Sequence, residues 1–237
     1  MNRLALMILK NIHRVPAAFY KLWRNAANPD KYPEQERWNH IQYIMKQAVK
    51  AGNIDLQVFG RENIPAEESY IMYGNHQGMF DVLAVVVSCD RPMGVVFKKE
   101  IENVPLIKQI AACTKSFGMD RSDVRQSLTV IQNVTKEVQS GRSYLIYPEG
   151  TRSRNGNEML EFHGGSFRAA LKAKCPIVPV AVIDSYKVLD EKGSKPVTVY
   201  LHYLDPIPYE EYKDLKTVDL AALVKTRIEE TVKKYAG

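Results

Sequence analysis

The 237-residue sequence contains few cysteines and no long apolar segment. Its three cysteines, Cys89, Cys113 and Cys175, lie far apart, so we predict no disulfide framework and expect a reducing compartment. No apolar run approaches the roughly 20 residues that a membrane-spanning helix needs. The N-terminal segment lacks a small-residue cleavage site after an apolar core, and we therefore expect no secretory signal peptide.

Several common active-site motifs are also missing. There is no G-x-S-x-G motif, which argues against a nucleophile elbow, and there is no P-loop or G-x-G-x-x-G motif. The five histidines are dispersed and form neither an H-E-x-x-H motif nor a Cys/His spacing typical of zinc sites. We expect no metal site.

Positive charge is concentrated at the N-terminal end. Residues 1–50 contain nine Lys or Arg and three acidic residues, and this difference of six equals the formal net charge of +6 of the whole chain. The remaining residues therefore contain equal numbers of basic and acidic side chains. A basic end on a neutral body favours an anionic partner, either a membrane surface or a nucleic acid.

The first 27 residues have the pattern of a basic amphipathic helix. At the helical period, six large apolar side chains share one face: Leu4, Ile8, Ile12, Val15, Phe19 and Leu22. The opposite face is basic, and Pro16 is expected to kink the helix. Such a helix either docks at a membrane interface or packs on its own domain with a solvated basic face. Nucleic acid is disfavoured, because the aromatic side chains lie on the apolar face rather than among the basic ones.

A second helix is predicted from about residue 34 to residue 50, after the helix-breaking segment NPDKYP at residues 28–33. Its apolar stripe includes Trp38. The N-terminal part is therefore predicted to be a basic amphipathic helical hairpin, a two-helix element over residues 1–52. An α/β domain follows over residues 53–237.

Strand-like and helix-like segments alternate in this second part. Seven segments are strand-like: residues 54–60, 69–74, 94–99, 115–119, 143–148, 177–183 and 197–204. A last helix is expected from about residue 219 to residue 235. The pattern predicts an α/β fold with a mixed, largely parallel sheet of about seven strands flanked by helices. Ligands of such open sheets bind at the carboxyl ends of the strands.

The loop after the second predicted strand reads GNHQGMFD (residues 74–81) and contains His76 and Asp81. Within one helix, a spacing of five residues would keep the two side chains apart. If His76 lies in the loop and Asp81 in the first turn of the next helix, the carboxylate can accept from one imidazole nitrogen. The other nitrogen is then free to act as a base. The alternative is structural, with Asp81 as a first-turn acid and His76 as a surface loop residue.

Polar side chains also follow three other predicted strands. One strand ends at Lys98, and the segment GMDRSD presents Arg121. A third strand runs into PEGTRSRNG (residues 148–156), in which Arg152 can bind an anion with its planar guanidinium and Thr151 adds a donor. Each segment can alternatively be a polar turn or a capped helix start. The segment FHGGSFRAA either presents backbone N–H groups to an anion or is an ordinary glycine loop.

Together these segments resemble the glycerolipid acyltransferase family, and most of all the bacterial 1-acyl-sn-glycerol-3-phosphate acyltransferases. NHQGMFD is similar to the N-H-x-x-x-x-D block of that family, SFGMDRSD to its second block and PEGTRS to its third. IVPVAV, with Pro179, is similar to the fourth block. Order and spacing match from about Asn75 to Val182. The sequence departs from the family pattern at His163, where lysine is common, and at Met119, where a bulkier residue is common.

The resemblance implies a mechanism. His76 would be the general base on a glycerol hydroxyl, and Asp81 would orient it and stabilise the imidazolium. The hydroxyl would attack an acyl thioester directly, and a backbone N–H would stabilise the oxyanion. Arg121 and Arg152 would hold the phosphate of the acceptor. The implied substrate-binding residues are Asn75, Lys98, Arg121, Glu149, Gly150, Thr151 and Arg152.

The implied activity is transfer of a fatty acyl chain to the sn-2 hydroxyl of lysophosphatidic acid, which gives phosphatidic acid in phospholipid biosynthesis. The donor would be acyl-CoA or acyl carrier protein, with no cofactor and no nucleic acid. A lipid acceptor favours membrane docking of the N-terminal helix on anionic phospholipids. We therefore expect a peripheral or monotopic protein at the cytoplasmic face of the cell membrane.

Three alternatives stay open. The acceptor could be another lysophospholipid or glycerol-3-phosphate. The protein could instead be a non-catalytic lipid-binding protein of the same fold, or a hydrolase that uses His76 to activate water.

Overall fold

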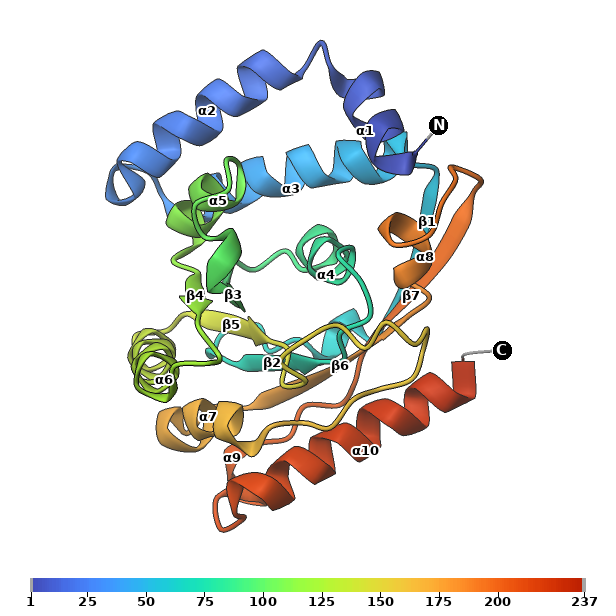
Figure 1. The fold of residues 1–237 in the computed structure, drawn as a ribbon. Coiled ribbons are helices and arrows are strands. Elements are labelled where there is room, and N and C mark those ends of the chain that lie inside the picture. The colour runs from blue at the N-terminus through green and yellow to red at the C-terminus, as the bar shows by residue number, and fades with distance from the viewer. Residues whose placement is uncertain (1, 236–237) are drawn as a thin grey trace.

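A seven-stranded sheet forms the centre of the computed structural model, which describes residues 2–235 (Figure 1). In chain order the strands are β1 (Ile54–Phe59), β2 (Ile71–Gly74), β3 (Met93–Lys98), β4 (Phe117–Met119), β5 (Ser143–Ile146), β6 (Ile177–Ile183) and β7 (Val197–Tyr203). Across the sheet the order is β1-β7-β6-β2-β5-β3-β4. All neighbouring pairs are parallel except β6 and β7. The predicted mixed, largely parallel sheet is therefore confirmed.

The central strands are buried on both faces, which explains their continuous apolar sequences. β2, β5 and β6 contain only buried residues, as is typical of parallel strands that helices cover. Side chains alternate between the faces, so that Met72 packs in one buried cluster whereas Ile71 and Tyr73 pack in the other. The sheet thus separates two hydrophobic cores.

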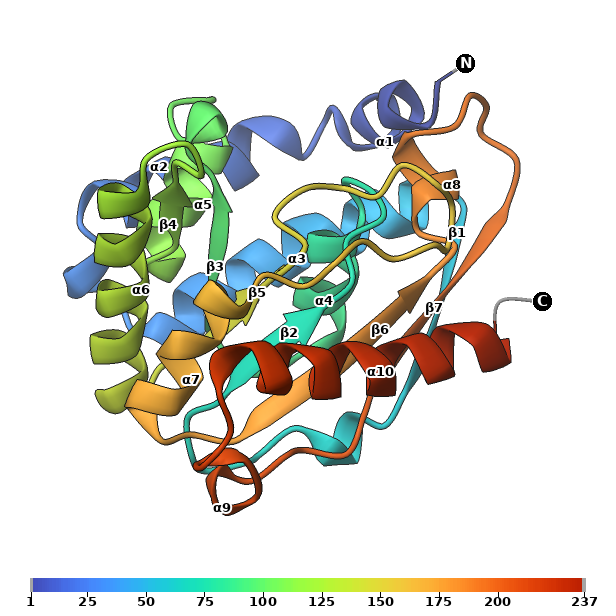
Figure 2. The ribbon, with the colours of Figure 1, turned by 60° about the horizontal axis from the view of Figure 1, so that its bottom comes forward.

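Helices lie on both sides of the sheet. One side carries α3 (Glu34–Ala51), α4 (Asp81–Ser88) and α5 (Ile107–Thr114). The other side carries α6 (Val124–Gln139), α7 (Arg168–Ala173) and α10 (Thr217–Tyr235) (Figures 1 and 2). Two further helices are short: α8 (Tyr186–Leu189) and α9 (Tyr209–Tyr212). The segment that follows β5 extends toward α8, along one end of the sheet (Figure 2).

Residues 3–27 form two helices, so the expectation of a single kinked helix is wrong. Together with α3, residues 2–52 contain three α-helices rather than the predicted two-helix hairpin. α1 (Arg3–Asn11) ends at a short turn, and α2 (Val15–Ala27) begins with Pro16 in its first turn. Proline is tolerated there because the first N–H groups of a helix have no partner within it. The turn also divides the predicted apolar face. Leu22 is fully buried, whereas Ile12 is 59% exposed.

The N-terminal helices pack on the α/β body. α1 and α2 lie outside α3, on the side away from the sheet (Figure 1). Met7 of α1 and Leu22 of α2 belong to the same buried cluster as Trp38 of α3 and Met72 of β2. The predicted division of the chain into an N-terminal element (residues 1–52) and an α/β domain (residues 53–237) stays a prediction. No helix within residues 2–235 has the length and apolar character that crossing a membrane requires.

Candidate active site

His76 and Asp81 meet at the carboxyl end of β2. The chain turns back after Gly74, and Asp81 is the first residue of α4. Nδ1 of His76 lies 2.6 Å from Oδ2 of Asp81. The Asp81 side chain is fully buried, whereas the His76 side chain stays 19% exposed. Nε2 of His76 has no protein hydrogen-bond partner in the described part of the chain, so it can receive a proton from a substrate.

Further donors hold the carboxylate of Asp81. Oδ2 also accepts hydrogen bonds from the backbone N–H groups of Gln77, at 2.7 Å, and Gly78, at 3.0 Å. Oδ1 accepts from the hydroxyl of Ser185, which follows β6. A buried carboxylate needs such partners, because it has lost its contact with water. Since the carboxylate can only accept, the proton of a neutral His76 ring lies on Nδ1 and the lone pair on Nε2.

The ring of Tyr147 supports His76. Tyr147 follows β5, and its ring stacks on the imidazole with centroids 4.4 Å apart and an interplanar angle of 22°. The Tyr147 side chain is buried. The imidazole is therefore fixed by stacking on one face and by the Asp81 hydrogen bond in its plane.

Glu149, in the PEGTRS segment, holds the backbone of residues 75–80, the loop between β2 and α4 that we call the catalytic loop after its candidate base His76. One carboxylate oxygen accepts from the N–H of His76 at 2.7 Å, and the other accepts from the N–H of Leu160 at 3.0 Å. Burial raises the pKa of Glu149 to about 7, although both backbone hydrogen bonds act to lower it. The N–H of Ser153 donates to the carbonyl of His76 at 2.8 Å. The PEGTRS segment thus contacts both polar backbone groups of His76, and a direct contact of Glu149 with substrate stays a prediction.

Asn75 continues the pairing between β2 and β6. Its side-chain amide donates to the carbonyl of Val182 and accepts from the N–H of the same residue, both at 2.8 Å. The backbone pairing of the two strands ends just before, at Gly74 and Val180. Because Asn75 is fully buried, its observed role is to fix the start of the catalytic loop, and its predicted contact with substrate stays a prediction.

Of the predicted phosphate-binding residues, Arg152 belongs to the PEGTRS segment and Arg121 approaches it, whereas no hydrogen bond or ion pair among the described residues joins Lys98 to it. Nη1 of Arg152 lies 2.5 Å from Oδ1 of Asp190. Arg121 approaches Gly150, since a Cβ atom at Gly150 would lie 3.7 Å from Cδ of Arg121. Lys98 is exposed at the end of β3 and pairs with Glu100 at 2.8 Å. Two other predicted positions are less involved in protein contacts: Thr151 is exposed and Gly150 is half-buried.

His163 lies closer to Gly150 than the sequence indicated. A Cβ atom at Gly150 would lie 3.2 Å from Cδ2 of His163, and Gly150 has a φ of +75°, which favours glycine. The N–H of His163 donates to the carbonyl of Pro148 at 2.9 Å. The histidine that departs from the family pattern and Arg121 therefore both lie close to Gly150.

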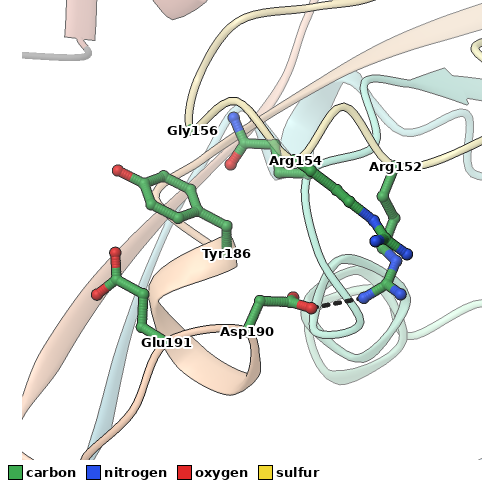
Figure 3. Close-up of a pocket in the computed structure, with 7 residues that line it drawn as sticks. Arg152, Arg154, Gly156, Tyr186, Asp190 and Glu191 are labelled. Carbon is green, nitrogen blue, oxygen red and sulfur yellow. Dashed lines mark hydrogen bonds and ion pairs between the residues drawn. The ribbon is translucent and has the colours of Figure 1, made fainter.

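A cavity of about 500 Å³ adjoins the catalytic loop (Figure 3). It is lined by Gln77, Arg152, Arg154, Gly156, Tyr186, Asp190 and Glu191. Gln77 follows His76 in the sequence, but His76 itself is not among the residues that line the cavity in the described part of the chain. Its lining is rich in charge of both signs, which suits a polar head group better than an apolar chain.

Sequence reasoning missed Ser185, Tyr147 and Asp190. Ser185 follows an apolar strand, as His76 and Glu149 do, so the strand-end argument that selected those residues could have found it. Tyr147 lay within the predicted strand 143–148 and gave no separate signal. Asp190 had no signal, because it lies beyond a short helix in a polar segment.

Among the described residues, His76 is held by a buried carboxylate and keeps its other nitrogen free at the carboxyl edge of an open α/β sheet, which is the arrangement expected of a candidate acid–base site. The sequence model of the family described as Acyltransferase matches residues 55–183, which is more than half of the chain. The protein therefore belongs to the Acyltransferase family.

Individual relatives agree with this assignment. The chain is similar to the 1-acyl-sn-glycerol-3-phosphate acyltransferase of Escherichia coli, with 30% identity over 169 residues that cover 70% of this chain and 69% of that protein. Its identity to the enzyme of the same name from Saccharomyces cerevisiae is 29% over 185 residues, or 76% of this chain and 61% of the yeast protein. The chain thus spans about three fifths of the yeast relative's length.

A solved structure has the same fold. The crystal structure of the 1-acyl-sn-glycerophosphate (LPA) acyltransferase PlsC from Thermotoga maritima superposes with a TM-score of 0.75. The match covers 98% of this chain and 97% of that one, at 20% sequence identity. The likeness therefore includes the N-terminal helices as well as the sheet.

Proposed function

We propose that the protein transfers a fatty acyl chain from an acyl thioester to the sn-2 hydroxyl of lysophosphatidic acid and so forms phosphatidic acid. The observation that carries this proposal is the pair of His76 and Asp81, 2.6 Å apart, with Nε2 of the histidine free of hydrogen bonds to residues 2–235. Relatives from bacteria and yeast that share the matched region are named 1-acyl-sn-glycerol-3-phosphate acyltransferases. The proposed donor is acyl-CoA or acyl carrier protein, as a substrate rather than a bound cofactor.

The chemistry needs one base and no protein nucleophile. Nε2 of His76 takes the proton of the acceptor hydroxyl while the hydroxyl oxygen attacks the thioester carbonyl carbon. Asp81 stabilises the imidazolium that forms. The tetrahedral intermediate then expels the thiolate, which takes this proton from Nε2. The atoms balance to an ester and a free thiol.

The phosphate of the acceptor needs cationic partners near this base. Arg152 and Gln77 both line the cavity. Arg121 comes from another segment but lies close to Gly150 of the PEGTRS segment. A guanidinium can donate two parallel hydrogen bonds to a phosphate, which fixes its position as well as its charge. These arginines would hold the glycerol backbone so that its free hydroxyl faces His76.

A lipid acceptor also requires access to a bilayer. Four large apolar side chains are exposed on α1 and at the residue that follows it: Leu4, Ile8, Leu9 and Ile12. Tyr20 and Trp23 of α2 are also exposed. The same segment carries most of the basic excess of the N-terminal region. Exposed apolar side chains next to basic ones are typical of an interfacial helix on an anionic surface. The proposed location is therefore the cytoplasmic face of the membrane, with peripheral or monotopic attachment.

The test is a transfer assay with identified products. Purified protein is incubated with a labelled acyl thioester, either of CoA or of acyl carrier protein, and with one acceptor at a time. The acceptors are lysophosphatidic acid, lysophosphatidylglycerol, lysophosphatidylethanolamine and glycerol-3-phosphate. Phosphatidic acid should form fastest, and only with the thioester present. Release of free fatty acid without acceptor acylation, or faster acylation of another acceptor, would contradict the proposal.

A further inference from the structure

The arginine of the PEGTRS segment already has an anionic partner. Nη1 of Arg152 and Oδ1 of Asp190 are 2.5 Å apart, and the dashed line in Figure 3 marks this pair. Their side chains remain 26% and 32% exposed, so the pair lies at an accessible wall of the cavity rather than in the core. The group that is expected to bind the phosphate is therefore neutralised by the protein itself.

Asp190 is anchored to the catalytic loop by its other oxygen. Oδ2 accepts a hydrogen bond from the N–H of Met79 at 3.2 Å, and the N–H of Asp190 donates to the carbonyl of Tyr186 at 3.1 Å, at the end of α8. One carboxylate thus connects the PEGTRS segment to the loop between His76 and α4. Its position is defined by the backbone on both sides.

The catalytic loop leaves room for this carboxylate only because residue 78 is glycine. A Cβ atom at Gly78 would lie 2.6 Å from Oδ2 of Asp190 and 3.0 Å from Cα of Tyr186. Both distances are shorter than a relaxed contact, and the second atom belongs to the backbone. α8 and its carboxylate therefore pack directly against the loop that carries His76.

The charges that line the cavity balance in the absence of a ligand. Arg152 and Arg154 contribute two positive charges, and Asp190 and Glu191 contribute two negative ones. A phosphate monoester brings up to two further negative charges. Asp190 contacts the guanidinium of Arg152 only through Nη1, so a phosphate that binds two of its N–H donors competes with the carboxylate for the same positive charge.

We propose that Asp190 is a displaceable counter-ion of Arg152, which the phosphate of the acceptor replaces on the guanidinium. This inference rests on the proposed function. In the empty site, Asp190 holds Arg152 at the cavity wall and ties it to the catalytic loop. When the acceptor binds, the phosphate takes over that contact, and Asp190 keeps its hydrogen bond from Met79. Asp190 is therefore a positioning residue whose hydrogen bonds orient Arg152, while its charge weakens phosphate binding.

The test removes the charge and keeps the shape. Asp190→Asn retains an oxygen that can accept from either Arg152 or Met79 but carries no negative charge. Partly exposed ion pairs are weak, so the expected gain in affinity is modest, about two- to fivefold. Inorganic phosphate is titrated into wild type and variant at constant ionic strength, with thermal stabilisation as the readout. The apparent Kd for phosphate should fall by this factor, and KM for lysophosphatidic acid should fall similarly with kcat unchanged.

Glu210→Gln is the matched control. Glu210 of α9 forms an ion pair at 2.6 Å with Lys213, just after that helix, and is not among the residues that line the cavity. Its substitution changes the net charge by the same amount. This variant should bind phosphate as wild type does. Unchanged or weaker phosphate binding by Asp190→Asn, in a variant that melts as wild type does, would overturn the inference.

The two readouts separate this inference from the proposed function. Phosphate binding needs no turnover. If wild type acylates no lysophospholipid but Asp190→Asn binds phosphate more tightly, the proposed function fails and the exchange at Arg152 stands. If wild type forms phosphatidic acid but Asp190→Asn changes neither Kd nor KM, the exchange fails and the proposed function stands.

Discussion

The hydroxyl of Ser185 donates a hydrogen bond to Oδ1 of Asp81, while Oδ2 of the same carboxylate accepts from His76. Ser185 is fully buried and comes from the end of β6, next to β2 in the sheet. Its N–H also donates to the side-chain oxygen of Gln77 at 3.3 Å. The chain of contacts from Ser185 through Asp81 to His76 fixes the plane of the carboxylate, and with it the direction in which Nε2 of the histidine points.

We expect Ser185→Ala to lower kcat about tenfold with little change in KM for the acceptor, because a hydrogen bond to a charged group is lost but no substrate contact is. Steady-state kinetics together with thermal melting measure this effect. Ser88→Ala is the control, since Ser88 is another buried serine whose hydroxyl bonds to Ala84 and Tyr203, away from the site. An equal loss of kcat in both variants would show that the effect is structural.

His76→Ala should lower kcat by about 10²–10⁴-fold, the usual contribution of a general base. The fold should survive, because the hydrogen bonds of residue 76 to Glu149 and Ser153 involve its backbone and not its ring. Single-turnover assays measure the chemical step, and circular dichroism checks the fold. A folded variant with near-normal activity would contradict the role of His76 as base.

The pairing of His76 with Asp81 could be predicted because it is local. Five positions separate the two residues, and a strand followed by a helix leaves few ways for the loop between them to fold. Ser185 lies 104 residues from Asp81, and Asp190 lies 38 residues from Arg152. The first contact depends on β2 and β6 being neighbours, and the second joins segments that follow β5 and β6, on either side of β2. Periodicity predicts the strands but not their order.

The sequence also could not predict which groups the side chains at the strand ends would contact. Glu149 was expected at a strand end, and it lies there, but the pattern could not show that both of its oxygens accept backbone N–H groups. The N-terminal helices show a related limit. A period of 3.6 residues put Leu22 and Ile12 on one face, but the turn between α1 and α2 buries the first and exposes the second.

The stability of the protein should decrease as the pH rises from about 4.5 to 7. Burial raises the pKa of Glu149 to about 7 from an ordinary value of 4.5, so in this range the folded protein binds a proton that the unfolded chain has released. The free energy of unfolding should fall by at most about 3 kcal/mol across this range through Glu149. Denaturant titrations of wild type and Glu149→Gln at several pH values measure the difference.

Glu149→Gln should lose this part of the pH dependence, because the amide does not titrate. Glu161→Gln is the control, since the Glu161 side chain is 87% exposed and its replacement should leave the pH dependence of wild type unchanged. If Glu149→Gln and wild type lose stability in parallel between pH 5 and pH 8, then Glu149 is not the group responsible.

Membrane binding should depend on the exposed apolar side chains of the N-terminal region. Ile8 and Ile12 are 52% and 59% exposed, so the double substitution Ile8→Glu/Ile12→Glu should leave the fold intact. It should weaken binding to anionic vesicles at least about tenfold, since each isoleucine would otherwise be buried among lipid chains. Vesicle co-sedimentation at low and high salt measures this, and wild-type binding should weaken with salt because the surrounding basic side chains contribute.

The control is Val124→Glu/Val218→Glu, which removes two valines that are 71% and 68% exposed on α6 and α10. Equal loss of binding in both double variants would indicate nonspecific charge repulsion rather than docking through α1.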